Sequence, residues 1–206
     1  MEPTDYRQAI AEYIRAQAQP TDKFSHQPRL YEVAKSLAHG EPYDDAVLYA
    51  AAWLHDLGVF TGHRPENLAE LASWDHVAYA MAKAPALLRS WAFPPDKIPA
   101  VIEAIRTHLP SRQPTSKEGV LLRDADILEQ LGAVGIVRMV SKVGRDTRYS
   151  AHGDAVRALR KSALELPNQL QLPLAREMAK GRLALMREFF EAIDQETGGM
   201  AFGPFI

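Results

Sequence analysis

The chain has 206 residues, of which 47% are hydrophobic and 24% are charged. This balance is typical of one soluble globular domain with a packed core. The formal net charge of −2 argues against a nucleic-acid-binding protein, since such proteins are usually basic. The sequence contains no cysteine, which excludes disulfides, thiolate catalysis and any zinc site built on sulfur.

The first residues, MEPTDYRQAI, lack the basic segment and apolar stretch of a signal peptide. The longest apolar run, Ala46 to Leu54, has nine residues, whereas a membrane helix needs about 20. We therefore expect a soluble cytoplasmic protein without membrane or nucleic-acid partners. The oligomeric state stays open, with a homodimer among the alternatives.

Helix-favouring residues dominate, and apolar side chains recur at spacings of three and four, which predicts an all-α fold. Polar loops are expected at Thr61 to Glu66, Pro110 to Ser116 and Ser141 to Ser150. The expected helices run from Thr4 or Asp5 to about Gln19, from Phe24 or Ser25 to His39 with Gly40 as C-terminal cap, from Asp44 or Asp45 to about Leu57, from Asn67 to Leu87 in one or two pieces, from Asp96 to His108, from Glu118 to Val140, and through a C-terminal region to about Asp194 with breaks near Pro167 and Pro173.

Ionisable residues stand out on otherwise apolar segments of five of these helices. In a helix bundle, metal and cofactor sites are built by side chains from facing helices. The residues are His26, the pair His55-Asp56, His76, His108, and Asp124 with Asp126.

This mixture of residue types suits a divalent metal. Neutral imidazole binds first-row transition metals, and carboxylates add harder ligands that neutralise the charge of the ion. An isolated buried carboxylate costs several kcal/mol, so a cation would explain acidic residues among leucines. A metal lowers the pKa of a bound water from about 15.7 towards about 7, which makes hydroxide available at neutral pH.

The ordered set His26, His55-Asp56 and Asp126 resembles the H…HD…D pattern of the HD superfamily of metal-dependent phosphohydrolases. The surrounding sequence is similar as well, from about residue 22 to 197. HQPRLYEVAKSLA resembles the opening helix, WLHDLG the signature, RDADILEQLGAVGI a DAD-containing segment of stand-alone bacterial members, and AREMAKGRLALMREFFEAIDQE their last helix.

The resemblance implies an all-helical HD fold in residues 22–197, preceded by an N-terminal helix within residues 1–21 and followed by a tail, 198–206. It implies hydrolysis of phosphoester or phosphoanhydride bonds with one or two divalent ions; Mn, Mg, Fe, Ni, Co and Zn stay open. The implied ligands of the principal metal are His26, His55, Asp56 and Asp126, with Asp124 as the alternative to Asp126.

His76 and His108 match positions where two-metal HD proteins have ligands of the second ion, and Asp56 would then bridge both. Either histidine could instead act on the substrate by stabilising the charge that develops on the leaving oxygen. The other possibility is a half-buried histidine bonded to a backbone carbonyl. Asp56, His76 and His108 are therefore the candidate catalytic residues.

Arg29, Arg112 and Arg123 are candidates for binding a phosphorylated small molecule, because guanidinium groups match phosphate oxygens. The sequence departs from the family pattern at Ile127, where arginine is common, and at Glu129, where we would expect aspartate. These changes leave the predicted ligands intact but place a substrate contact in doubt.

Several residues are expected to have no catalytic role. We expect Trp53, Trp74 and Trp91 to be core residues, and the following histidines to lie in loops or on the surface: His39, His63 and His152. His63 is near enough to the HD dipeptide to line a cleft.

Two other functions stay open. A few HD-fold proteins are di-iron oxygenases, and the predicted ligands could hold two irons. A nucleotide-binding sensor without turnover is the remaining alternative.

Overall fold

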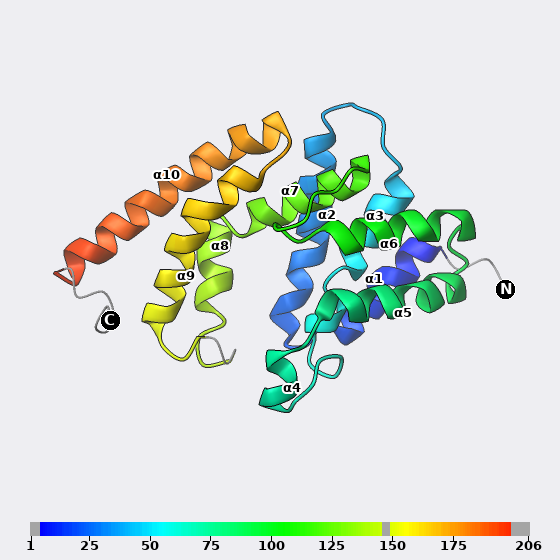
Figure 1. Ribbon diagram of the computed structural model, residues 1–206, viewed down its shortest axis with the longest axis horizontal. Coiled ribbons are helices and arrows are strands. Elements are labelled where there is room, and N and C mark those ends of the chain that lie inside the picture. The colour runs from blue at the N-terminus through cyan, green and yellow to red at the C-terminus, as the bar shows by residue number, and fades with distance from the viewer. Residues whose placement is uncertain (1–4, 146–148, 199–206) are drawn as a thin grey trace. The chain divides into compact units, whose positions relative to one another are not determined.

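The computed structural model describes residues 5–145 and 149–198. Within these residues the regular elements are α-helices and short 3-10 helices, together with one isolated bridge between Thr61 and Arg64. The predicted all-α class is thus confirmed (Figure 1). The chain forms two compact units, Met1–Ala125 and Asp126–Ile206, and the boundary falls inside one helix.

Four helices of the first unit are preceded by polar residues that act as N-terminal caps. Asp5, Asp44, Asn67 and Asp75 each accept a hydrogen bond from a backbone N–H of the helix that follows. Its elements are α1 (Tyr6–Gln17), η1 (Thr21–Ser25), α2 (His26–Ala38), α3 (Asp45–Leu54), η2 (Leu57–Val59), α4 (Leu68–Ala72), α5 (His76–Ser90), η3 (Pro95–Lys97) and α6 (Ile98–Thr107), followed by the first part of α7 (Lys117–Glu129).

Helix α3 is the central element of this unit. It packs against α1, α2 and α6, and α6 also lies along α5 (Figure 1). Ala50, Ala51 and Ala52 are fully buried, because their small side chains allow neighbouring helices to approach α3 closely. The apolar run noted in the sequence is therefore close packing, and it carries His55 and Asp56 at its end.

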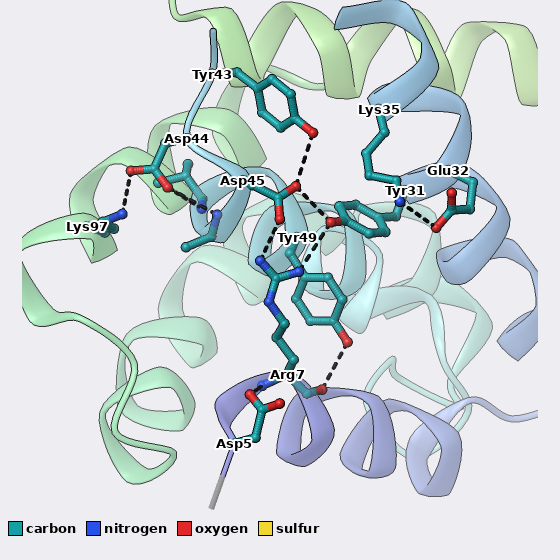
Figure 2. Close-up of polar contacts among 12 residues, drawn as sticks. Asp5, Arg7, Tyr31, Glu32, Lys35, Tyr43, Asp44, Asp45, Tyr49 and Lys97 are labelled. Atoms are coloured by element: carbon teal, nitrogen blue, oxygen red, sulfur yellow. Dashed lines mark hydrogen bonds and ion pairs between the residues drawn. The ribbon is translucent and has the colours of Figure 1, made fainter. Parts of the chain in front are cut away.

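A polar network surrounds the N-terminal end of α3 (Figure 2). The Arg7 guanidinium donates to Asp45 Oδ2 at 2.5 Å and to the Tyr31 hydroxyl at 3.2 Å. The Tyr31 hydroxyl donates to Asp45 Oδ1 at 2.7 Å, and the Tyr49 hydroxyl donates to the Arg7 carbonyl at 2.9 Å. These bonds fix α1 against α2 and α3.

The end of the third predicted helix and the capping residue of the second differ from the structure. The third helix stops at Leu54 rather than at Leu57, because Asp56, with φ −99° and ψ 14°, leaves the helical conformation and a 3-10 turn follows. The second helix ends as predicted near residue 39, but the residue that first adopts the left-handed conformation is His39, with φ 49°, and Gly40 follows with φ 82°.

The second unit contains the end of α7, then α8 (Gly132–Val140), α9 (His152–Glu165), η4 (Leu166–Gln169) and α10 (Pro173–Glu196). Helix α8 packs against α9 and α10. The predicted continuous helix from Glu118 to Val140 is wrong: Leu131 is extended and Gly132 has φ +71°. Glycine adopts that conformation without a steric penalty, so the helical phase is interrupted there.

Several expectations remain untested. Thr4 and part of the predicted loop (146–148) lie outside the described residues, as does most of the predicted tail, 198–206. The domain limits 22–197 stay a prediction. Among the helices of the described residues, none has the length and apolar character needed to cross a membrane.

Candidate metal centre

The HD dipeptide lies where α3 ends. His55 is the C-terminal cap of α3, and its backbone N–H donates to the Ala51 carbonyl at 3.0 Å. Asp56 is the next residue, at the start of the turn into η2. The imidazole of His55 is 1% exposed and the carboxylate of Asp56 is 20% exposed, so the pair joins a buried group to one that solvent reaches.

The first ligand group consists of His26, His55 and Asp56. His26 is the first residue of α2, and its side chain is 6% exposed. Asp56 Oδ2 lies 3.9 Å from His26 Nε2 and 3.6 Å from His55 Nε2. Helices α2 and α3 therefore bring three of the predicted principal ligands together, with one atom of each within 4.8 Å of the others.

The second ligand group consists of Asp56, His76 and His108. His76 is the first residue of α5, and its Nε2 lies 3.9 Å from the other oxygen of Asp56, Oδ1. His108 is the C-terminal cap of α6 and is fully buried. One ligand atom from each of the three residues again lies within 4.8 Å of the others, so the two groups share Asp56.

Backbone carbonyls orient two of the imidazoles. His55 Nδ1 lies 3.0 Å from the Ala52 carbonyl, and His108 Nδ1 lies 2.7 Å from the Ile105 carbonyl. A carbonyl only accepts hydrogen bonds, so Nδ1 carries the proton in both rings, and Nε2 of a neutral ring keeps its lone pair. Metal-binding histidines in proteins are oriented in the same way.

The separations around Asp56 fit a shared cation. At 3.6 to 3.9 Å, these nitrogen–oxygen pairs are farther apart than the roughly 3.2 Å limit of ordinary hydrogen bonds. Histidine nitrogens lie about 2.0–2.1 Å and carboxylate oxygens about 2.0–2.2 Å from an ion such as zinc, so one of each can be up to about 4.3 Å apart. The donor set and its spacing thus fit a divalent metal.

Arg123 and Asp124 lie in the core beside this region of the first unit. Both side chains are fully buried, with Arg123 Nη1 3.5 Å from Asp124 Oδ1. Arg123 Nη2 also donates to the Pro110 carbonyl at 2.9 Å, two residues after His108. Burial lowers the pKa of the Arg123 guanidinium, and the Asp124 carboxylate acts in the opposite direction.

Asp126 is 9% exposed, and its carboxylate accepts from Gln130 Nε2 at 3.1 Å. It is the first residue of the second unit, and its role as a metal ligand stays a prediction from the sequence motif.

Arg29 and Arg112, the predicted substrate residues other than Arg123, are accessible to solvent. Arg29 donates to the Ser25 carbonyl at 2.9 Å, and Arg112 is exposed after the turn that follows His108.

His63 has a structural contact on each ring nitrogen. Its Nδ1 is 2.9 Å from the Tyr79 hydroxyl, and its Nε2 is 2.8 Å from Gln17 Oε1. Burial, with a further contribution from Lys83, lowers the pKa of this imidazole. His63 therefore joins the loop after η2 to α1 and α5.

The sequence did not indicate the contact between Gly58, which lies in the WLHDLG signature, and Trp74. Trp53 is buried as expected, but Trp74 is only partly buried and its indole Nε1 donates to the Gly58 carbonyl at 2.8 Å. The glycine that follows the HD dipeptide was visible in the sequence, but no local pattern indicated its partner.

Comparison with known proteins gives a consistent result. The HD domain family model matches residues 24–131. The crystal structure of Bacillus subtilis YpgQ is 21% identical, with a TM-score of 0.75 over 97% of this chain and 100% of that chain. A YpgQ structure in complex with ADP is also 21% identical, with a TM-score of 0.71 over 95% and 97% of the two chains.

A third structure, of a predicted HD superfamily hydrolase from an uncultured Thermotogales bacterium, is 27% identical, with a TM-score of 0.61 over 93% of this chain and 90% of that chain. The search of curated proteins found no match. The family match spans just over half of the chain and includes both residues of the HD dipeptide together with their neighbours in space, His26, His76 and His108. The chain therefore belongs to the HD domain family.

Proposed function

We propose that this protein is a metal-dependent phosphohydrolase that cleaves a phosphoester or phosphoanhydride bond of a nucleotide or a small phosphorylated metabolite. The observation that carries this proposal is the convergence of imidazoles on both oxygens of Asp56. The likeness to named HD-superfamily hydrolases supports the reaction class. The YpgQ structure with ADP, which shares the fold, makes nucleotides the first substrates to test.

In this proposal His26, His55 and Asp56 hold the principal metal. Asp126 is the fourth ligand, as the sequence motif implies. A bound divalent ion would supply a water of lowered pKa and would polarise a phosphoryl oxygen. The chain's own contribution is to orient the imidazoles of His55 and His108 and to hold a proton on Nδ1 of each, through the carbonyls of Ala52 and Ile105.

Asp56 has the central role, since its two oxygens face different histidines. It can therefore bridge two ions, with His76 and His108 completing the second site. Alternatively, these two histidines contact the phosphate directly and stabilise the charge on the leaving oxygen. The number of metals bound per chain distinguishes the two roles.

Arg29 and Arg112 are the proposed contacts for the phosphate or for the rest of the substrate, because both reach solvent. Arg123 was also a candidate. Its side chain is fully buried and donates to a backbone carbonyl, so any effect on substrate would act through the segment that carries His108.

The test is release of phosphate and pyrophosphate from a panel of nucleoside mono-, di- and triphosphates with added Mn²⁺. Wild-type protein is compared with Asp56→Ala and Asp126→Ala, and circular dichroism verifies that each variant is folded. Release by the wild type alone is expected, and the product identifies the bond that breaks.

Equal release by the wild type and both variants would place the activity elsewhere and contradict the proposal. If no nucleotide is hydrolysed, iron content and substrate-dependent oxygen consumption are measured next. Two tightly bound irons with an oxygen-dependent product would establish the oxygenase instead, and tight nucleotide binding without turnover would establish a sensor.

A further inference from the structure

We propose that Gly58 and Trp74 are positioning residues that hold His76 in place as a ligand of the second metal. The inference rests on the proposed function, since it concerns the Asp56–His76–His108 group. In this inference, two residues that are not ligands hold the start of α5 against η2, the turn that follows Asp56.

The first observation is the close approach of two backbones. Element η2, which contains Gly58, packs against α5. A Cβ atom added at Gly58 would lie 2.6 Å from the His76 carbonyl oxygen and 2.8 Å from its Cα. Both are backbone atoms of the first turn of α5, so a side chain at position 58 could be accommodated only if α5 moved away.

The second observation is a hydrogen bond across the same contact. Trp74 precedes α5 by two residues, and its indole N–H donates to the Gly58 carbonyl at 2.8 Å. Glycine at position 58 allows the backbones of η2 and α5 to make contact, and the hydrogen bond from the indole holds the segment that leads into His76. Asp75 then caps α5 by accepting from the Ala78 N–H at 2.9 Å, which sets where the helix begins.

The position of His76 depends on this contact more than the other ligands depend on theirs. His26 and His55 are almost fully buried, whereas the His76 side chain is 30% exposed and fewer core atoms restrain it. It is the first residue of α5, where helices fray most readily. The contact at Gly58 therefore determines whether His76 Nε2 stays 3.9 Å from Asp56 Oδ1.

The experiment is calorimetric titration of the full-length, metal-depleted protein with MnCl₂ in the absence of nucleotide. The wild type is expected to bind two ions, and His76→Ala to lose the weaker step. Trp74→Phe keeps the ring and removes the N–H donor, so it should weaken that step about three- to tenfold, the usual effect of one lost hydrogen bond. Gly58→Ala should weaken it by at least as much.

The same two substitutions, tryptophan to phenylalanine and glycine to alanine, are made at other positions as controls. Trp91→Phe alters a tryptophan at the other end of α5, and Gly181→Ala adds a methyl group in α10 where nothing lies within 4 Å. Both should bind Mn²⁺ as the wild type does. Trp74→Phe combined with His76→Ala should match His76→Ala alone, because the indole acts through that histidine. Thermal unfolding verifies that every variant is folded.

The proposal is overturned if Trp74→Phe and Gly58→Ala bind both ions normally, or if they weaken both steps equally. It is also overturned if the wild type binds a single ion that His76→Ala leaves unchanged. Failure of the proposed function would look different: Mn²⁺ binding would respond as expected, but no phosphorylated substrate would be hydrolysed.

Discussion

Helix α3 has carboxylates at both of its ends, and the two ends stabilise them by different means. Asp44 and Asp45 lie at the N-terminus, where the helix dipole favours negative charge and cationic side chains are close (Figure 2). Asp44 accepts from two backbone N–H groups and lies 2.7 Å from Lys97 Nζ. Asp45 accepts from Arg7 and from the hydroxyls of Tyr31 and Tyr43.

Asp56 lies just past the C-terminus of α3, where the helix dipole disfavours negative charge. His26, His55 and His76 face it, and imidazoles must be neutral to bind a metal. A bound cation would thus add positive charge at the C-terminus of α3, where it offsets both the Asp56 carboxylate and the negative end of the helix dipole. The comparison indicates that the aspartates at the start of α3 stabilise the fold, whereas the aspartate at its end has the role of a metal ligand in the proposed function.

The largest effect is expected for Asp56→Ala. Loss of the shared ligand should abolish binding of both ions and lower phosphate release by more than the roughly 10- to 100-fold typical of residues that only orient a ligand. Removing a carboxylate from an unfavourable helix end should leave the melting temperature in the absence of metal near the wild-type value. Calorimetry with Mn²⁺ measures the loss of binding, and a thermal melt measures the stability. Normal Mn²⁺ binding by this variant would contradict the distinction between the two ends of α3.

Asp45→Ala should have the converse result. Three donors lose their acceptor at a partly exposed site, so the free energy of unfolding should fall by about 1–2 kcal/mol. Mn²⁺ stoichiometry should be unchanged, because the substitution is at the opposite end of α3. Urea denaturation measures the loss, and a change in metal stoichiometry would show that the network contributes to the site.

Asp44→Ala is expected to have a smaller effect on stability. The substitution removes a helix N-cap, which typically costs about 1 kcal/mol. Asp44→Asn is the matched control, since asparagine caps helices as well as aspartate does but cannot pair with Lys97. A loss in the asparagine variant as large as in the alanine variant would assign the stability to the ion pair instead of the cap.

The smallest expected effect is on the stability of the protein at acid pH. Burial acts to raise the pKa of Asp45, but its bonds to Tyr31 and Arg7 outweigh burial and hold the pKa below the usual value of about 3.9. A lowered pKa means that this carboxylate stabilises the fold above about pH 4 and that the contribution is lost as pH falls through the folded-state pKa. Asp45→Asn should therefore flatten the acid limb of stability measured between about pH 5 and pH 2; an unchanged slope would contradict the assignment.

The sequence predicted elements best where a local signal marked the end of a helix. The caps at Asp5, Asp44 and Asn67 were correct, as were the breaks near Pro167 and Pro173. These signals act over two to four residues, so they are visible without tertiary structure. The break before α8 was missed because apolar periodicity continued through Gly132, and its left-handed conformation became apparent only from the backbone.

Of the candidate site residues, the histidines that cluster with the HD dipeptide could be singled out from the chemistry of their side chains and their order in the chain. His26, His76 and His108 are far apart in the sequence from the HD dipeptide but close to it in space. The contact between Gly58 and Trp74 could not be predicted in the same way. It depends on how the chain returns from η2, through α4, to the start of α5, and that path is determined by tertiary packing.

The length of α3 has a consequence for how the protein can vary. The ten residues of α3, Asp45–Leu54, run from the network around Arg7, which includes Asp45, to the HD dipeptide. Each helical residue adds about 1.5 Å of rise and about 100° of rotation, so inserting or deleting a single residue would turn both ligands away from α2 and α5. The residues of α3 can therefore be exchanged for others of similar size, but their number determines the direction in which the candidate ligands at its end point.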